Sequence, residues 1–254
     1  MLKISNLSLT INQKTVLHDI NFNTSAGKFI AIIGPNGAGK SSLLKTISQD
    51  IAFSHGEIQL HQRTLNQWPK QKLATLLGVL PQESSLSFPF KVYDVVSMGL
   101  YPLSHSHQKG LMIIEGLLHQ LAIYHLKDRP YPSLSGGEKQ RVHLARVLTQ
   151  LSQAHKPPLL LLDEPTSALD LSQQHNVLGL IQSLTQHNQY TVMAVLHDLN
   201  LASQYADELI IMKQGEIAQT GLPSQCLTHQ TINDIWGYNP SILNVSHRSS
   251  PVII

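Results

Sequence analysis

The sequence predicts an α/β fold with parallel central strands, an antiparallel β subdomain at the N-terminus and an inserted α-helical subdomain. Three observations lead to this prediction. Short apolar runs alternate with helix-like segments along most of the 254 residues. Two stretches near the start alternate apolar with polar residues, as antiparallel strands do. One long block in the middle of the chain is helical in pattern throughout.

The predicted elements follow in chain order. "LKISNLSLTI" and "HDINFNT" predict the antiparallel strands, and "KFIAII" predicts a buried strand. Residues 39–48 predict a helix with one apolar face, and "GEIQL" and "LLGVLPQ" predict two more strands. After the helical block, "PLLLLD" and "TVMAVLHD" predict strands on either side of the helical "SQQHNVLGLIQSLTQH". The segment "ELIIMKQGEIAQTG" predicts a hairpin that turns at Gln214 and Gly215.

The change of pattern also predicts the domain organisation. We expect residues 1–82 and 152–254 to form the α/β core with its N-terminal antiparallel strands. Residues 83–151 are expected to form the inserted helical subdomain. Strands that alternate with helices connect in parallel through crossovers, so the central strands should share one sheet.

Composition excludes several classes of protein. A formal net charge of +2 is too small to indicate a nucleic acid or a membrane surface as partner. The only cysteine, Cys226, rules out a disulfide within the chain and favours a reducing compartment. The N-terminal stretch lacks the apolar core of a signal peptide, and no apolar run approaches the roughly 18 residues of a membrane span. We therefore expect a cytosolic chain that meets a membrane only through a partner.

A glycine-rich loop follows the strand "KFIAII". Residues 34–41 fit the pattern G-x-x-x-x-G-K-[ST] between a strand and a helix, which is typical of a P-loop NTPase with a RecA-like core. Backbone N–H groups in such a loop surround phosphates at a helix N-terminus. Lys40 is expected to reach the β- and γ-phosphates of a nucleoside triphosphate, and the Ser41 hydroxyl to ligate Mg²⁺. The predicted nucleotide-binding residues of this loop are Gly34, Pro35, Asn36, Gly37, Ala38, Gly39, Lys40, Ser41 and Ser42.

Two adjacent carboxylates end the apolar run "LLLLDE". Consecutive strand residues point to opposite faces, so Asp163 and Glu164 cannot share one role while both stay in strand geometry. Ligands bind at the carboxyl ends of strands in open α/β sheets. There, Asp163 is expected to hold Mg²⁺, and Glu164 to orient and deprotonate the attacking water.

Five motifs, taken in order, give a family resemblance. They are "GPNGAGKSS", "LSGGEKQR", "LLLLDEP", "SALD" and "LHD". Together they closely resemble the ATP-binding subunit of ABC transporters, over nearly the whole chain. The resemblance implies an ATPase coupled to transmembrane transport, with ATP and Mg²⁺ as its cofactors.

The second motif implies a partner. Ser135 precedes two glycines and would cap a helix whose N-terminal N–H groups form a second anion site. The resemblance adds Gly136, Gly137 and Glu138 to the nucleotide-binding residues. It implies that two copies pack head to tail, so that each ATP lies between the phosphate loop of one chain and the LSGGE of the other.

Further roles follow residue by residue from the resemblance. Gln82 matches the glutamine that contacts Mg²⁺ and the attacking water, at the hinge to the helical subdomain. His197 matches the switch histidine that bonds the γ-phosphate and steadies Glu164. Asp170 matches the loop that crosses the dimer seam. Where many relatives have an aromatic residue that stacks on adenine, this chain has Ile11, so apolar packing must hold the base.

The segment "VLPQESSLSFPFKVYDVVSMGLYP" resembles the region that docks on the membrane subunits of importers for iron chelates, heme and cobalamin. Phe88, Phe90, Val92 and Val95 are expected either to line this docking groove or to pack in the subdomain core. The overall resemblance is greatest to hemin importers, and iron siderophores or cobalamin stay open as cargoes. It implies two transmembrane permease subunits, a periplasmic or surface hemin-binding protein and a peripheral place on the cytoplasmic face of the inner membrane.

Two other hypotheses compete with that of a transport ATPase. A soluble ABC-type protein acting on nucleic acid or ribosomes usually has two tandem modules or a long coiled coil, and this chain has neither. A nucleotide-binding module without turnover would not need both Glu164 and His197. His105 and His107 could suggest a heme or metal site, but no cysteine or carboxylate cluster accompanies them, which favours solvated side chains.

Overall fold

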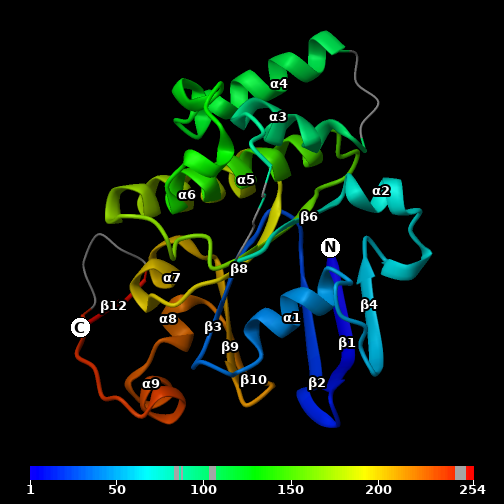
Figure 1. Ribbon diagram of the computed structural model, residues 1–254. Helices are drawn as coiled ribbons and strands as arrows, with labels where there is room; N and C mark the ends of the chain where they lie inside the picture. Colours follow the sequence, from blue (N-terminus) through cyan, green and yellow to red (C-terminus); the bar gives the residue numbers. More distant parts are fainter. Residues whose placement is uncertain (83–85, 87, 103–106, 244–249) are drawn as a thin grey trace.

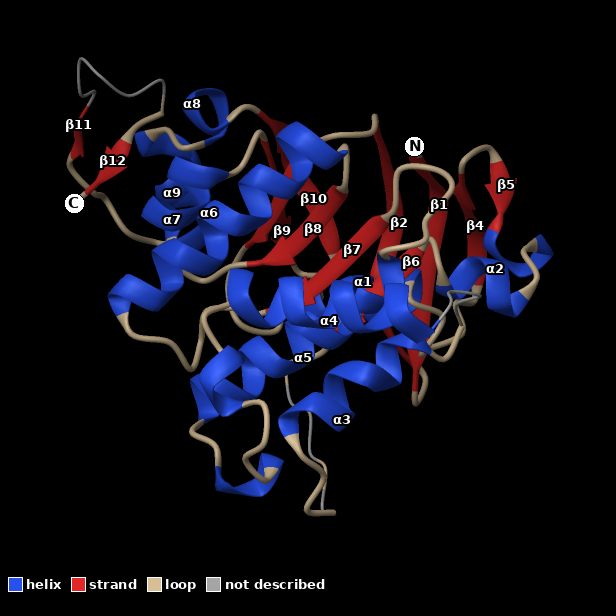
Figure 2. Ribbon diagram, turned by 90° about the horizontal axis from the view of Figure 1, so that it is seen from above, coloured by secondary structure: helices blue, strands red, loops and turns tan. Residues whose placement is uncertain are grey.

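The computed structural model describes residues 1–254 apart from 83–85, 87, 103–106 and 244–249 (Figure 1). An antiparallel sheet, a mostly parallel sheet and a layer of helices pack on one another (Figures 1 and 2). The two sheets contain the strands that the sequence predicts. His105 lies outside the described residues, and the side chain of His107 is not described either.

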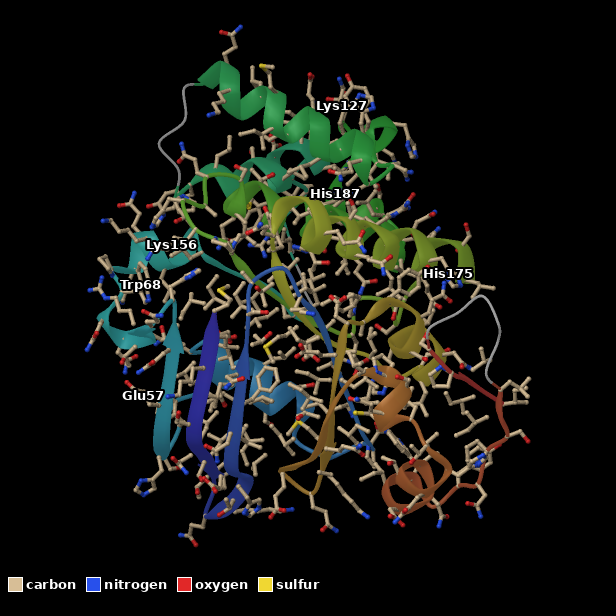
Figure 3. All side chains as sticks on the ribbon, turned by 180° about the vertical axis from the view of Figure 1, so that it is seen from behind. Glu57, Trp68, Lys127, Lys156, His175 and His187 are labelled. Atoms are coloured by element: carbon tan, nitrogen blue, oxygen red, sulfur yellow. The ribbon has the colours of Figure 1, made fainter. Side chains whose placement is uncertain are left out.

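The antiparallel sheet is built from the N-terminal part of the chain. Its strand order is β2-β1-β4-β5. The bounds are β1 (Leu2–Ile11), β2 (Lys14–Thr24), β4 (His55–Leu60) and β5 (Arg63–Thr64). Trp68, just beyond β5, anchors the sheet to the rest of the core: its indole N–H donates to the Leu60 carbonyl at 3.2 Å, and Lys156 lies over its ring at 5.6 Å (Figure 3).

The central sheet has the order β10-β9-β3-β8-β7-β6. All neighbours are parallel except β10, which pairs antiparallel with β9. The bounds are β3 (Phe29–Ile33), β6 (Leu77–Leu80), β7 (Leu159–Asp163), β8 (Thr191–Val195), β9 (Glu208–Lys213) and β10 (Glu216–Gly221). Every residue of β3, β7 and β8 is buried, because both faces of a parallel sheet are covered.

The two faces of this sheet bury different partners. Along β3, Phe29, Ala31 and Ile33 pack with the helices, whereas Ile30 and Ile32 pack with the antiparallel sheet and the first helix. The helices are α1 (Lys40–Ile47), α2 (Lys70–Ala74), α3 (Val92–Ser97), α4 (His107–Gln120), α5 (Gly136–Leu151), α6 (Leu171–Asn188), α7 (Leu199–Tyr205), α8 (Pro223–Cys226) and α9 (His229–Trp236). A short C-terminal hairpin pairs β11 (Ile242–Leu243) with β12 (Val252–Ile253).

The helical block between β6 and β7 shares its core with the central sheet. A Cβ on Gly78 of β6 would lie 2.7 Å from Val147 Cγ1 of α5, so side chains of α5 pack directly against the strand backbone. Buried side chains of α3, α4 and α5 form one cluster with those of the sheet. The domain boundaries at residues 82 and 151 stay a prediction.

The structure divides the four residues between the two alternatives, docking groove and subdomain core. Val92 and Val95 are 0% exposed and belong to the shared core, because both lie on the inner face of α3. Phe88 and Phe90 are 70% and 37% exposed, with ring centroids 6.0 Å apart. Of the four residues, these two alone are available to a partner.

The predicted hairpin turn is confirmed and supports the phosphate loop. Gln214 and Gly215 both have positive φ, 50° and 84°, as the two central residues of a type I′ turn require. The Gly215 N–H donates to the Ala38 carbonyl at 3.0 Å, and its carbonyl accepts from the His18 N–H at 2.8 Å. The turn between β9 and β10 therefore ties the phosphate loop to β2.

A buried histidine makes the helical block sensitive to acid. His143 on α5 is 5% exposed, and its Nε2 lies 2.8 Å from the hydroxyl of Tyr131. Burial, reinforced by Arg146, lowers the pKa of His143 from 6.5 to about 4. Between these two values the unfolded chain binds the extra proton and the folded chain does not.

We predict that His143 does not affect the free energy of unfolding above about pH 6.5 and lowers it by about 3 kcal/mol in total as the pH falls from about 6.5 to about 4. Urea titrations of the parent and of His143→Gln across this range check it. The dependence of the unfolding free energy on pH should be much weaker in the variant. An equal dependence in both proteins would contradict its assignment to His143.

Candidate functional site

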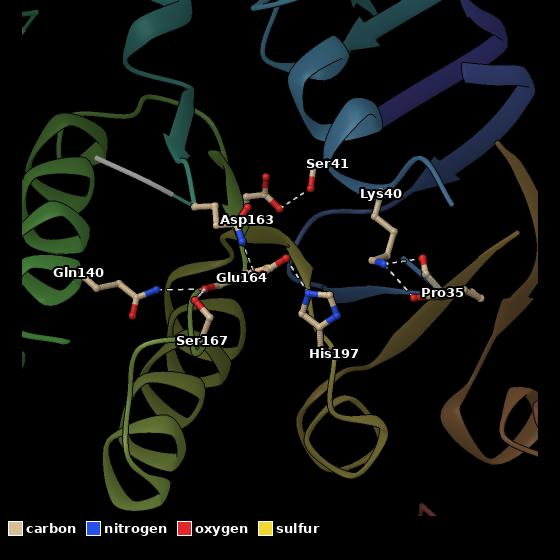
Figure 4. A network of polar contacts seen from close by, with 10 residues as sticks. Pro35, Lys40, Ser41, Gln140, Asp163, Glu164, Ser167 and His197 are labelled. Atoms are coloured by element: carbon tan, nitrogen blue, oxygen red, sulfur yellow. Dashed lines mark hydrogen bonds and ion pairs between the residues drawn. The ribbon is translucent and has the colours of Figure 1, made fainter. Parts of the chain in front are cut away.

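The parallel sheet brings the phosphate loop, the two carboxylates, Gln82 and His197 to one edge. The phosphate loop follows β3, Asp163 and Glu164 lie at the end of β7, and His197 follows β8. Gln82 follows β6. Because these strands run parallel in register, their carboxyl ends meet at one edge of the sheet. Figure 4 shows the resulting network.

The phosphate loop has the backbone that its glycines permit. Gly37 and Gly39 have φ values of 78° and 98°, which L side chains rarely adopt. At Gly34 a Cβ would lie 2.2 Å from the Met212 carbonyl oxygen, so only glycine fits where the loop leaves β3. The loop then enters α1 at Lys40, with backbone N–H groups at the helix N-terminus.

Lys40 points back into its own loop. Its ammonium donates to the carbonyl oxygens of Gly34 at 2.8 Å and Pro35 at 2.9 Å (Figure 4). The residue is 6% exposed, and burial lowers the pKa of its amine, while Glu164 and Asp163 act in the opposite direction. A buried ammonium held by two neutral carbonyls is well placed to exchange them for an anionic phosphate, which binds it more strongly.

Ser41 and Asp163 form an oxygen pair that fits Mg²⁺. Ser41 Oγ donates to Asp163 Oδ1 at 2.9 Å. Two adjacent oxygens of a Mg²⁺ octahedron, each about 2.1 Å from the metal, are about 3 Å apart. Within the described residues, no group of three or more His, Cys, Asp or Glu side chains could hold a metal. The remaining ligands would therefore come mainly from phosphate and water, as Mg²⁺ prefers.

Burial governs the charge on Asp163. The side chain is 6% exposed, and burial raises the pKa of its carboxyl, with the neighbouring Glu164 adding to the rise. The bond from Ser41 and the positive charge of Lys45 lower that pKa. A cation bound here would favour the ionised form further.

Glu164 leaves strand geometry as soon as β7 ends. Its φ is 52°, a left-handed conformation that costs a non-glycine residue about 1–3 kcal/mol. The turn separates the two carboxylates: Asp163 Oδ1 contacts Ser41, and Glu164 Oε1 lies 2.6 Å from Nε2 of His197. Glu164 Oε2 accepts from the Gln82 amide at 2.8 Å.

A cavity of about 300 Å³ opens between these groups. It is lined by Val16, Glu164, His197 and the phosphate loop from residue 36 to residue 42. Val16, on β2, escaped the sequence analysis because an isolated valine in a strand carries no signal. The half-buried Ile11, expected near adenine, does not line this cavity.

The LSGGE residues lie elsewhere in the same chain. Ser135 caps α5: its hydroxyl accepts from the Glu138 N–H at 3.3 Å, and the Glu138 carboxylate accepts from the Ser135 N–H at 2.7 Å. None of residues 135–138 lines the cavity of the phosphate loop. Gly136 and Gly137 instead face Ala168 and Leu169. Asp170 is exposed and caps α6 through the Gln173 N–H at 2.8 Å.

Comparison with known proteins supplies the family. The family model described as ABC transporter matches residues 17–167. This chain belongs to the ABC transporter family. A hemin import ATP-binding protein, HmuV, of Shewanella denitrificans is 50% identical over 254 residues, 100% of both chains. A protein of the same name from Photobacterium damselae is 45% identical over 253 residues, which cover 100% of this chain and 95% of the relative.

Solved structures of ABC ATPases share the fold. One, from an ABC transporter assigned to the metal-chelate type in an inward-facing conformation, is 27% identical with a TM-score of 0.80, covering 99% of this chain and 95% of its own. The ATP-binding cassette MJ0796, in a dimeric post-hydrolysis state bound to ADP and Pi, is 25% identical with a TM-score of 0.76, covering 87% and 98%.

These findings confirm the predicted P-loop NTPase fold and the predicted ABC ATPase, an enzyme that binds and hydrolyses ATP. Among the helices that the structure describes, none combines the length and the apolar character of a membrane span.

We predict that Lys40→Ala abolishes productive ATP binding, because it removes the cation that is expected to reach the β- and γ-phosphates. Equilibrium binding of a fluorescent ATP analogue measures the loss. Lys70→Ala, an exposed lysine on α2, serves as the control and should bind within about threefold of the parent, since an exposed charge contributes little. Equal affinity in Lys40→Ala and the parent would contradict the site.

Proposed function

We propose that the chain is the ATP-hydrolysing subunit of an importer that carries hemin across the cytoplasmic membrane. One observation supports hemin as the cargo: proteins named for hemin import are 44–50% identical to this chain over 92–100% of its length. The site geometry supports the ATPase part independently, through the phosphate loop and the carboxylates beside it.

The roles of the site residues in this proposal are as follows. The phosphate loop and Lys40 bind the phosphates of ATP, while Ser41, Asp163 and the Gln82 amide would hold Mg²⁺. The metal, when bound with ATP, neutralises phosphate charge. Glu164 orients a water molecule and accepts its proton as the water oxygen bonds to the γ-phosphorus. The bond from that phosphorus to the β–γ bridging oxygen breaks, which releases ADP and phosphate.

His197 and Gln82 support this step from two sides. The contact of 2.6 Å from His197 to Glu164 fixes one carboxylate oxygen, and the 2.8 Å bond from Gln82 fixes the other. A carboxylate held at both oxygens has few rotamers left, which is the preorganisation that proton transfer needs.

In this proposal a second copy of the chain supplies the LSGGE residues, which do not line the cavity of their own chain. Ser135, Gly136, Gly137 and Glu138 of the partner would close on the γ-phosphate, because a capped helix start is an anion site. Asp170 would lie at the interface between the two copies. The proposal also includes two permease subunits, a hemin-binding protein that delivers the cargo, and a peripheral place at the cytoplasmic face of the membrane.

An uptake assay tests the proposed function. In the organism that encodes the chain, deletion of the gene should stop growth on hemin as the only iron source. The parent gene should restore growth, and Glu164→Gln should not, although the purified variant still binds ATP and accumulates as an ATP-bound dimer. Growth on ferrous salt is the control. A deletion strain that uses hemin normally, or one that loses siderophore or cobalamin uptake instead, would contradict the cargo.

We further predict that Ser135→Arg lowers ATP turnover at least about tenfold while each chain still binds ATP, because the arginine occupies the phosphate-facing start of α5. Ser133→Arg, two residues earlier on an exposed turn, is the matched control. Turnover is measured over a range of ATP concentrations. If Ser135→Arg kept the parent's cooperativity in ATP, the shared site would be wrong.

A further inference from the structure

The backbone carbonyl of Glu164 is held by three donors. Gln140 Nε2 donates to it at 3.0 Å, Ser167 Oγ at 3.1 Å and the Ser167 N–H at 3.3 Å (Figure 4). Ser167 belongs to the same turn as Glu164. Gln140 does not: it lies on α5, 24 residues earlier in the chain. One of the three bonds therefore connects the turn to a separate helix.

This bond acts on a conformation that needs support. Glu164 has φ of 52°, and a residue with a Cβ adopts this region only when its surroundings hold it there. The direction of the Glu164 side chain depends on this backbone. Loss of a donor to the carbonyl lets the turn relax, and the carboxylate then shifts relative to His197 and Gln82.

Gln140 belongs to the same end of α5 as the LSGGE residues. It follows Ser135 by five positions, within the first two turns of the helix. This end of α5 rests on the segment after Glu164: a Cβ on Gly137 would lie 2.9 Å from Leu169 Cδ2 and 3.2 Å from the Ala168 carbonyl oxygen. A displacement of the α5 N-terminus therefore changes the bond from Gln140 to Glu164.

We propose that Gln140 is a positioning residue, which couples the placement of the LSGGE helix to the orientation of the Glu164 carboxylate in the same chain. The inference rests on the ATPase activity of the proposed function. The partner's ATP contacts the start of α5, so closure of the dimer would adjust the Glu164 of the chain that donates that helix. The orientation of Glu164 at each site would thus depend on whether ATP occupies the other site.

Packing alone does not explain why position 140 holds a glutamine. Its Oε1 is buried without a hydrogen-bond partner among the described residues, which disfavours an amide at this position. A methionine would fill the same space without that unsatisfied acceptor. The bond from Nε2 to Glu164 is the interaction that a methionine cannot make.

The test compares Gln140→Met with Gln150→Met in the full-length chain. Gln150 is on the same helix and also donates to backbone carbonyls, those of Ala74 at 2.7 Å and Leu77 at 3.2 Å, but it does not contact Glu164. We expect Gln140→Met to lower kcat about five- to tenfold with KM for ATP within twofold of the parent. Gln150→Met should leave kcat within twofold.

Two further variants separate positioning from folding. Ser167→Ala removes another donor to the same carbonyl from an exposed side chain and should lower kcat in the same sense. In a Glu164→Gln background, single-turnover hydrolysis should be insensitive to Gln140→Met, because a residue that acts through Glu164 has nothing left to orient. Thermal unfolding of every variant reports whether it is folded.

The outcomes distinguish the two proposals. If the parent does not hydrolyse ATP, the proposed function fails. If the parent hydrolyses ATP and Glu164→Gln slows hydrolysis to a residual single-turnover rate, two results overturn the inference about Gln140 alone. The first is an unchanged kcat in Gln140→Met, and the second is a loss as large in the Glu164→Gln background as in the parent.

Discussion

The left-handed turn at Glu164 is the constraint on which the site depends. Strand β7 is buried along its whole length, and in a continuing strand its last carboxylates would point to opposite faces of the sheet. A φ of 52° at Glu164 ends the strand instead. Asp163 then stays against Ser41 of the phosphate loop, and Glu164 faces His197 and Gln82. In the proposed mechanism, metal binding and proton transfer then belong to two adjacent residues.

The same turn lies between the two expected anion sites, the phosphate loop and the start of α5. The phosphate loop lies on one side of Glu164, and the helix α5 that carries Gln140 lies on the other (Figure 4). The start of α5 packs on the segment after the turn, so it takes no part in the cavity of its own phosphate loop. Within a single chain, the capped start of α5 therefore lies outside the cavity that the phosphate loop lines. Two copies arranged head to tail would bring the two anion sites together.

Local patterns could be predicted from the sequence, and contacts between distant segments could not. The phosphate loop, the strand before it and the turn at Gln214 and Gly215 follow from residues that are adjacent in the chain. The burial of Val92 and Val95, the pairing of Tyr131 with His143 and the bond from Gln140 to Glu164 depend on how α3 and α5 pack, which periodicity does not specify. The positive φ of Glu164 has no signal either, because glutamate rarely adopts it.

The central claim is that one chain holds an incomplete catalytic centre, and the dependence of ATP hydrolysis on chain concentration tests it most directly. Specific activity is measured over a dilution series at saturating ATP and Mg²⁺, with sedimentation to report the fraction of dimer. The account predicts a specific activity that falls with the dimer fraction and approaches zero for single copies. A specific activity that stays constant down to concentrations where every copy is separate would contradict it.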